Sequence, residues 1–192
     1  RPVIVIGLPR SGTTNLVNLL ASDTRYRSMP LWESYQRVPD PAEEMVDGVD
    51  PRWTRCQGMW EAMQVGAPFV AAMHPMNPDH VHEEIELQEL DFCTYNLEWY
   101  TRVPRWRDFY LSCDARPSYA YLKRVLQALT WLRGPNRWIL KSPQHLERLP
   151  ELVETFPDAT VVLTHPGGHE YFRPARAAIV AFFQRQTRPE VR

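Results

Sequence analysis

The stretch that decides the fold of this 192-residue chain is Val3-Ile4-Val5-Ile6-Gly7-Leu8-Pro9-Arg10-Ser11-Gly12-Thr13-Thr14. Its four β-branched residues in succession predict a strand that is buried on both faces, as in parallel α/β sheets. Gly7 and Gly12 then have the spacing of a phosphate-binding loop. Residues 13–22 follow with leucines at helical spacing. Strand, glycine-bounded loop and helix open a βαβ unit, so we expect the loop to bind an anion at the helix N-terminus.

A second βαβ unit lies near residue 140. Arg137–Leu140 is a short strand candidate, Pro143 opens a helix with an apolar face, and Thr160–Leu163 is another buried run. We therefore predict an α/β fold of the P-loop NTPase-like, three-layer type. Its strands Val3–Ile6, Arg137–Leu140 and Thr160–Leu163 should lie in one parallel sheet.

The residues between these units are less regular. Residues 39–82 hold many of the 18 prolines and few clear periods, so we expect loops with short helices over the edge or top of the sheet. Helical spacing of apolar residues returns in Glu83–Tyr95 and in Tyr119–Leu132. Gly134-Pro135 should end the second of these helices.

Composition argues against several classes of protein. A net charge of -1 argues against a nucleic-acid binder. The longest apolar runs, such as residues 177–183, fall far short of the roughly 20 residues of a membrane span. Cys56, Cys93 and Cys113 are odd in number and far apart, so a reduced, cytoplasmic protein is expected. The chain begins at Arg1 without a signal peptide, and we expect it to be truncated at both ends.

The predicted anion site has no carboxylate of the kind that holds Mg²⁺ in NTPases. Lys141 follows the second strand, and Thr164-His165 ends the third. Thr13 stands where an NTP-binding loop has lysine, and the cation, Arg10, lies inside the loop. These residues predict binding of a phosphate-like group without a metal. A tight turn with a capping serine is the alternative interpretation of the loop.

A metal site at His80-Val81-His82-Glu83-Glu84 is the less favoured interpretation of that stretch. It lacks the second histidine of an H-E-x-x-H pattern, and the cysteines are isolated. A helix start with acidic residues in its first turn explains it better. We therefore predict no metal.

The loop and the second βαβ unit together resemble the PAPS-dependent sulfotransferases. The resemblance is closest to the bacterial branch whose loop reads Pro-Arg-Ser-Gly-Thr-Thr, and it covers roughly Pro2 to His165. It rests on Gly7–Thr14, on Leu140-Lys141-Ser142-Pro143-Gln144-His145-Leu146, on Phe156-Pro157-Asp158-Ala159 and on Thr164-His165. We therefore predict a sulfotransferase-like core over residues 1–165 and an atypical tail over residues 166–192.

The resemblance implies transfer of a sulfuryl group from PAPS to a hydroxyl or amine of a small-molecule acceptor. Arg10 and Lys141 would act as catalytic cations on the sulfate and the leaving phosphate. Glu33 would take the acceptor proton, with His145 as the rival base. The residues implied in PAPS binding are Arg10, Ser11, Gly12, Thr13, Thr14 and Lys141.

The tail departs from the family pattern. In the family, an Arg-Asp-Pro-like sequence and a later serine hold the 3′-phosphate of PAPS, whereas Pro166-Gly167-Gly168 follows His165 here. We therefore expect this chain to bind PAPS weakly and to turn over poorly or not at all. A non-catalytic nucleotide-binding remnant of the fold is one alternative. A P-loop kinase is the other, disfavoured by Thr13 and the missing carboxylate.

Overall fold

Four parallel strands in the order β2-β3-β1-β4 form the sheet of the computed structural model, which describes residues 1–164 without the side chains of residues 99 and 100. The strands are β1 (Val3–Gly7), β2 (Tyr26–Arg27), β3 (Arg137–Lys141) and β4 (Thr160–Thr164). Val5 pairs with Lys141 of β3 and Gly7 pairs with Thr164 of β4. The predicted fold class is confirmed, and the three predicted strands lie in one parallel sheet. The edge strand β2 was not predicted, because two residues show no period.

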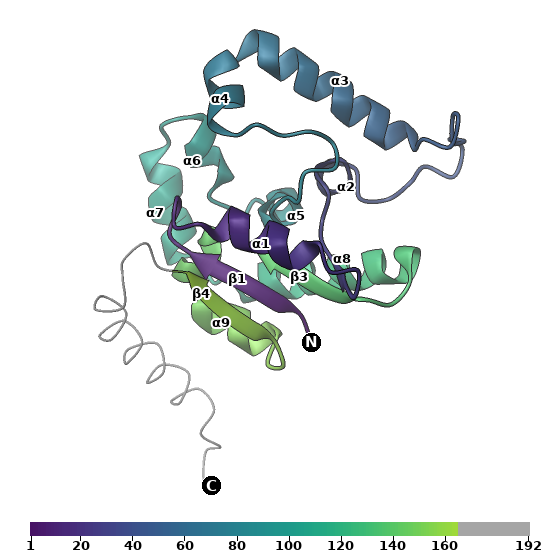
Figure 1. Cartoon of the computed structure of the whole chain (residues 1–192). Coiled ribbons are helices and arrows are strands. Elements are labelled where there is room, and N and C mark those ends of the chain that lie inside the picture. The colour runs from purple at the N-terminus through teal and green to yellow at the C-terminus, as the bar shows by residue number, and fades with distance from the viewer. Residues whose placement is uncertain (165–192) are drawn as a thin grey trace, which may run out of the picture.

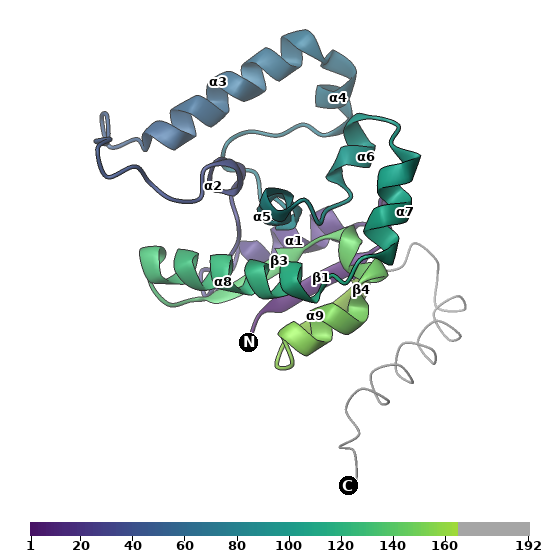
Figure 2. The same cartoon turned by 180° about the vertical axis from the view of Figure 1, so that it is seen from behind.

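Helices cover both faces of the sheet, which gives three layers (Figures 1 and 2). Ile4 and Ile6 of β1 pack on one face, against α8 (Arg116–Arg133) and α9 (Leu149–Thr155). Val3 faces the opposite way and packs with Val17 of α1 (Thr13–Ala21). The unbroken apolar run of β1 therefore reflects burial on two sides.

Helix α8 supplies much of the larger core. Leu122, Leu126 and Leu129 are buried on one side of it, each worth about 1.5–3 kcal/mol of apolar burial. Its predicted end is confirmed at Gly134, which has a φ of 84°. It begins earlier than predicted, at Arg116, because Pro117 occupies the first turn, where a missing N–H costs nothing.

Residues 39–82 are more helical than predicted. They contain α3 (Pro51–Gly66) and α4 (Pro68–Met73). In Figures 1 and 2 these helices lie farther from the sheet than the short helix α2 (Leu31–Tyr35). The expectation of short helices alone was wrong for α3, which has 16 residues. Asp50 caps it by accepting a hydrogen bond from the Arg52 N–H, and Pro51 fits its first position. Prolines mark helix starts in this segment.

Two other predicted helices are broken. Residues 83–95 form α5 (Ile85–Gln88) and the 3-10 helix η1 (Glu89–Asp91), which ends at Phe92 with a φ of 57°. All four residues of α5 are buried, so their apolar spacing does not mark one exposed and one buried face. The helices α6 (Asn96–Tyr100) and α7 (Pro104–Ser112) follow. After Pro143, the 3-10 helix η2 (Pro143–Glu147) precedes α9.

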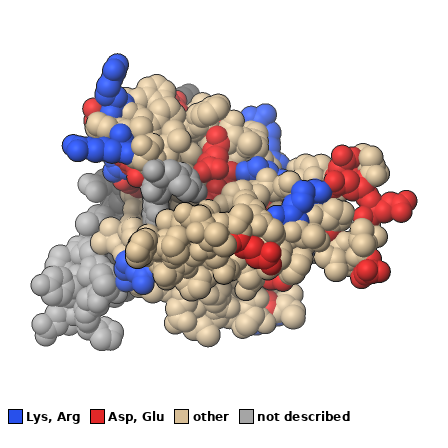
Figure 3. All heavy atoms as spheres, turned by 90° about the horizontal axis from the view of Figure 1, so that it is seen from above, with Lys and Arg blue, Asp and Glu red and all other residues tan. Residues whose placement is uncertain are grey.

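Charged side chains of both signs lie on the face shown in Figure 3, with acidic ones gathered at one end, over the loop between α2 and α3. Within residues 1–164, no helix combines the length and the apolar character needed to cross a bilayer. The predicted tail, residues 166–192, lies outside the described residues.

Candidate anion-binding site

The loop between β1 and α1 carries backbone N–H groups that can bind an anion. Arg10 and Gly12 both have positive φ values, of 66° and 86°. Gly12 is the N-cap of α1, and no side chain caps the first turn of that helix. The first N–H groups of a helix have no partner within it, and the helix dipole favours a negative charge beside them. The loop Gly7–Thr14 therefore has the backbone geometry of an anion cradle, with the exposed Arg10 in it.

Gly7 lets the loop pass close to the end of β4. A Cβ atom at Gly7 would lie 2.1 Å from Thr164 Oγ1 and 2.8 Å from Ser11 Oγ. The two hydroxyl oxygens are themselves 2.7 Å apart and share a hydrogen bond. The loop is thus tied to the neighbouring strand by Ser11 and Thr164. Thr164 was not predicted as a site residue, because nothing in the sequence pairs it with Ser11.

Lys141 brings a second cation to the loop. It is the last residue of β3, and its side chain is only 5% exposed. Its Nζ lies 3.4 Å from Thr14 Oγ1 and donates a hydrogen bond to it. The ammonium also forms an ion pair with Glu83. Glu83 was not predicted as a site residue, because the stretch His80–Glu84 is interpreted from sequence as a helix start with acidic residues in its first turn.

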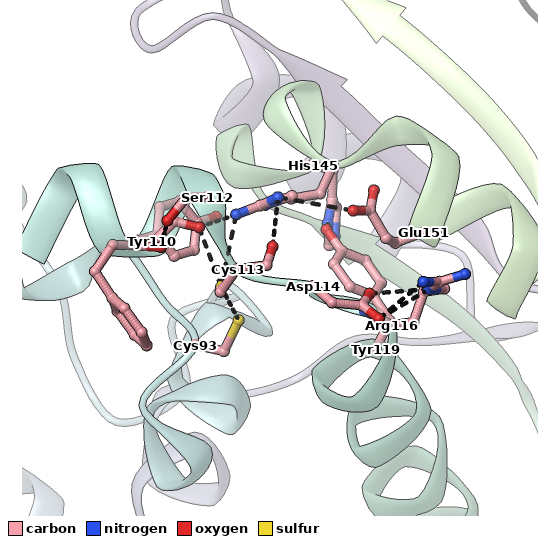
Figure 4. Close-up of polar contacts among 11 residues, drawn as sticks. Cys93, Tyr110, Ser112, Cys113, Asp114, Arg116, Tyr119, His145 and Glu151 are labelled. Carbon is pink, nitrogen blue, oxygen red and sulfur yellow. Dashed lines mark hydrogen bonds and ion pairs between the residues drawn. The ribbon is translucent and has the colours of Figure 1, made fainter.

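The next residue, Glu84, holds the backbone at the end of β3. Glu84 is fully buried, and its carboxylate accepts the Lys141 N–H at 2.8 Å. It also lies 2.6 Å from Nε2 of the fully buried His145. The other ring nitrogen of His145, Nδ1, is 2.7 Å from the Tyr119 hydroxyl. Figure 4 shows these two side chains side by side. Because both nitrogens of His145 are bonded inside the protein, neither is left for an acceptor molecule.

A second buried hydrogen-bonded chain joins η2 to α5 and α8. Gln144 donates to Gln88 at 3.0 Å, and Gln88 donates to Ser118 at 3.1 Å. Gln144 also accepts the Tyr95 N–H at 3.0 Å. The turn after Lys141 is therefore fixed by polar contacts on several sides, which orients the residues beside the loop.

Three histidines, His74, His80 and His82, lie close enough to Lys141 for its charge to act on them. Burial lowers the pKa of His80 to about 4, helped by His82 and by Lys141. Burial also lowers the pKa of His82 to about 4, and the charge of Lys141 adds to it. For His74, burial followed by the charges of Arg10 and Lys141 lowers the pKa. These imidazoles are neutral at pH 7. In the part of the chain from residue 1 to 164, no group of three or more His, Cys, Asp or Glu side chains is placed to hold a metal ion.

Glu33 lies apart from the loop in a buried ion pair. It is 2% exposed in α2, and its Oε2 is 2.6 Å from Arg133 Nη1 at the end of α8. Burial raises the pKa of Glu33, while the charges of Arg133, Arg52 and Arg27 oppose the rise. Among the described residues, no polar contact joins Glu33 to the loop Gly7–Thr14.

Comparisons with known proteins point to one family. A family model described as a sulfotransferase family matches residues 2–184. The chain is similar to sulfotransferase STF9 from Mycobacterium avium, with 28% identity and a TM-score of 0.72, over 86% of this chain and 42% of that one. It is also similar to sulfotransferase STF1 from Mycobacterium tuberculosis H37Rv, with 30% identity and a TM-score of 0.63, over 86% and 45%. The chain thus spans less than half the length of either structure. A comparison with curated proteins gave no match.

Proposed function

The chain belongs to the sulfotransferase family, and we propose that it serves the transfer of a sulfuryl group from PAPS to a hydroxyl or amine of a small-molecule acceptor. The observation that carries this proposal is the contact between Lys141 Nζ and Thr14 Oγ1, which brings a buried cation from β3 to an anion-binding loop. We also propose a cytoplasmic protein, since its three cysteines are free thiols.

The loop fits the phosphosulfate end of PAPS. The uncapped N–H groups of α1 and the hydroxyls of Ser11, Thr13 and Thr14 would donate hydrogen bonds to its oxygens. When bound, PAPS supplies a sulfuryl group on a phosphate leaving group. Arg10 and Lys141 would hold the sulfate and balance the charge that grows on that phosphate. Preorganised donors of this kind are each worth about 2.7–4 kcal/mol in a transition state.

Two carboxylates are candidates for the base that takes the acceptor proton. Glu33 follows from the resemblance, and its buried position raises its pKa toward the range of a useful base. To act, it would have to leave Arg133. Glu83 is the second candidate, because it already contacts Lys141 beside the loop. An anion that draws Lys141 toward itself would free the Glu83 carboxylate to accept a proton.

Two other functions differ from this one in what they would bind. A P-loop kinase would need a lysine at Thr13 and a carboxylate for Mg²⁺ beside the loop. A non-catalytic remnant of the fold would bind nucleotide without turnover. Thermal-shift measurements separate the kinase from the sulfotransferase, using PAPS, adenosine 3′,5′-bisphosphate and ATP at about 1 mM, each with and without Mg²⁺. We expect the first two to raise Tm more than ATP does. A larger rise with ATP and Mg²⁺ would support the kinase.

The sequence after Thr164 should affect the affinity for the 3′-phosphate of PAPS. Pro166 offers neither a cation nor an N–H where the resembling family has arginine. Loss of a charge-assisted partner of this type costs about 2–5 kcal/mol. We therefore propose that the 192-residue chain binds adenosine 3′,5′-bisphosphate more weakly than about 1 µM, which isothermal titration calorimetry would measure directly. Micromolar or tighter binding would contradict this part of the proposal and leave the family unchanged.

A further inference from the structure

Two half-buried thiols meet between the helices that flank the site. Cys93 lies two residues after the end of η1, and Cys113 is the C-cap residue of α7. Their sulfur atoms lie 3.9 Å apart and are joined by a dashed line in Figure 4. The third cysteine, Cys56, is buried in α3. Cys93 and Cys113 therefore form a pair, although 20 positions separate them in the sequence.

The surroundings of the pair allow the sulfur atoms to approach. A disulfide needs a distance of about 2.05 Å, so the atoms must move together by roughly 1.9 Å. Cys93 lies outside η1 and Cys113 caps the end of α7, so rotation of either side chain disturbs no hydrogen bond within a helix. Cys113 would lose its weak S–H donor to the Tyr110 carbonyl, at 3.1 Å. Arg148 donates to the same carbonyl, so the oxygen keeps a partner.

We propose that Cys93 and Cys113 are a redox-sensitive pair that forms an intramolecular disulfide when the protein meets a hydroperoxide. The bond closes residues 94–112, which contain α6 and α7, into a loop. Because Tyr95 at the start of this loop bonds to Gln144 of η2, the disulfide fastens the segment beside the turn that follows Lys141. This proposal does not depend on sulfotransferase activity.

The chemistry proceeds in two steps. One cysteine loses its proton, and its thiolate attacks an oxygen of the hydroperoxide. The O–O bond breaks, a sulfenic acid forms, and the hydroxide that leaves H₂O₂ takes up that proton as water. The sulfur of the second cysteine then attacks the sulfenic sulfur while its S–H proton passes to the departing oxygen. The S–S bond forms, the S–O bond breaks, and the leaving hydroxide takes the released proton as water. Two thiols and one H₂O₂ thus give one disulfide and two waters.

Ionisation sets which thiol reacts first. Burial, and then the neighbouring Cys113, raise the pKa of Cys93 to about 12. Cys93 is therefore a thiol at neutral pH and is suited to the second step. Arg148 Nη2 lies 3.8 Å from the sulfur of Cys113, and its Nη1 donates to the Cys113 carbonyl at 3.3 Å. Arg148 therefore lies directly beside Cys113, and we assign Cys113 to the first step.

Peptide mapping of the oxidised chain tests the proposal. The 192-residue chain with Cys56→Ser is treated with a small excess of H₂O₂, alkylated and digested with trypsin without reduction. Cleavage after Arg102, Arg107 and Lys123 separates the two cysteines, because the bond before Pro117 resists trypsin. We expect peptides 56–102 and 108–123 to be recovered joined, and to separate on treatment with dithiothreitol. Recovery of both peptides with alkylated thiols, or a disulfide between two chains, would overturn the proposal.

Thermal unfolding supplies a second readout. Closing a loop of this size should raise Tm by about 5 °C or more in the oxidised chain. Cys93→Ser and Cys113→Ser should each abolish that rise, whereas Cys56→Ser, the matched control, should keep it. The number of free thiols in the unsubstituted chain tests the proposal without any variant. This number should fall from three to one on oxidation. An unchanged count of three would contradict the proposal.

Discussion

Glu84 Oε1 lies 2.6 Å from His145 Nε2, and both side chains are fully buried. The same carboxylate accepts the Lys141 N–H, so one acidic group holds both the end of β3 and the turn after it. A buried carboxylate is stable only when its oxygens are bonded, and here both oxygens have partners. The position of Lys141 at the loop therefore depends on Glu84.

Replacing Glu84 by glutamine should destabilise the protein markedly. The amide keeps the shape of the side chain but can accept with only one of its two polar ends, so either His145 or the Lys141 N–H loses its acceptor. We expect a loss of about 2–4 kcal/mol in the free energy of unfolding, measured by urea denaturation. Glu44→Gln in the exposed loop before α3 is the control and should change little. If both variants lose the same free energy of unfolding, the contacts of Glu84 with His145 and Lys141 do not stabilise the fold.

Gly7→Ala should disturb the loop, because the new Cβ would lie 2.1 Å from Thr164 Oγ1. Overpacking of this kind costs about 1–3 kcal/mol. Gly58→Ala in α3 is a matched control, since its Cβ would meet nothing within 4 Å. Alanine also favours a helix, so the control should be neutral or stabilising by up to about 1 kcal/mol. Equal unfolding midpoints for the two variants would contradict the close approach.

Arg10→Ala and Lys141→Ala should each lower turnover with PAPS by about 10²–10³-fold in an active enzyme that contains this segment. The reason is that each cation balances charge that develops only as the sulfuryl group leaves. Binding of adenosine 3′,5′-bisphosphate should fall less than turnover does. Lys123→Ala is the control, because that exposed lysine donates to the Thr155 carbonyl far from the loop. A Lys141 variant with the turnover of the control would rule out its shared role with Arg10.

Glu33→Gln and Glu83→Gln, measured side by side, identify the base. Loss of a general base lowers kcat by about 10²–10⁴-fold and leaves PAPS affinity nearly unchanged. We expect this signature for Glu33→Gln. If Glu83→Gln lowers kcat in this way and Glu33→Gln does not, Glu83 is the base. If neither variant lowers kcat, neither Glu33 nor Glu83 takes the proton.

Stability should fall as the solution is acidified below neutral pH. His80 and His82 have pKa values of about 4 in the folded protein, against the ordinary value of 6.5 in the unfolded chain. Between these values the unfolded chain binds protons that the folded protein does not, so acid favours unfolding. The double variant His80→Gln and His82→Gln should show a smaller loss of stability between pH 6.5 and about 4, by urea denaturation at each pH. An identical pH dependence would contradict the neutral state of these rings.

The elements that the sequence predicts correctly are those whose signals are local. Residues 3–6, 137–140 and 160–163 are continuous apolar runs, and the glycine spacing places the loop between a strand and a helix. Helix α3 escaped prediction because its apolar residues form no stripe, and its start depends on one capping aspartate, Asp50. The strand β2 is defined by its pairing with β3 and by nothing within itself.

The site residues that escaped prediction act through distant partners. Glu83 meets Lys141 across 58 positions of sequence, and Ser11 meets Thr164 across 153. No local period encodes such a contact. By contrast, the position of Lys141 beside the loop could be predicted, because parallel strands bring their carboxyl ends to one edge of the sheet.

The tie between Ser11 and Thr164 also fixes when the anion cradle can be completed. The loop is synthesised long before β4, and a ribosome adds roughly 5–20 residues each second. Until residue 164 has emerged, β1 lacks the neighbour that pairs with it from Val3 to Gly7. Pairing of two segments so far apart in the sequence has an entropic cost of loop closure. The contacts of the complete sheet offset this cost. During synthesis, the edge of β1 that pairs with β4 therefore stays unpaired for many seconds, and the loop after β1 stays open. We expect this edge to need protection from pairing with other chains.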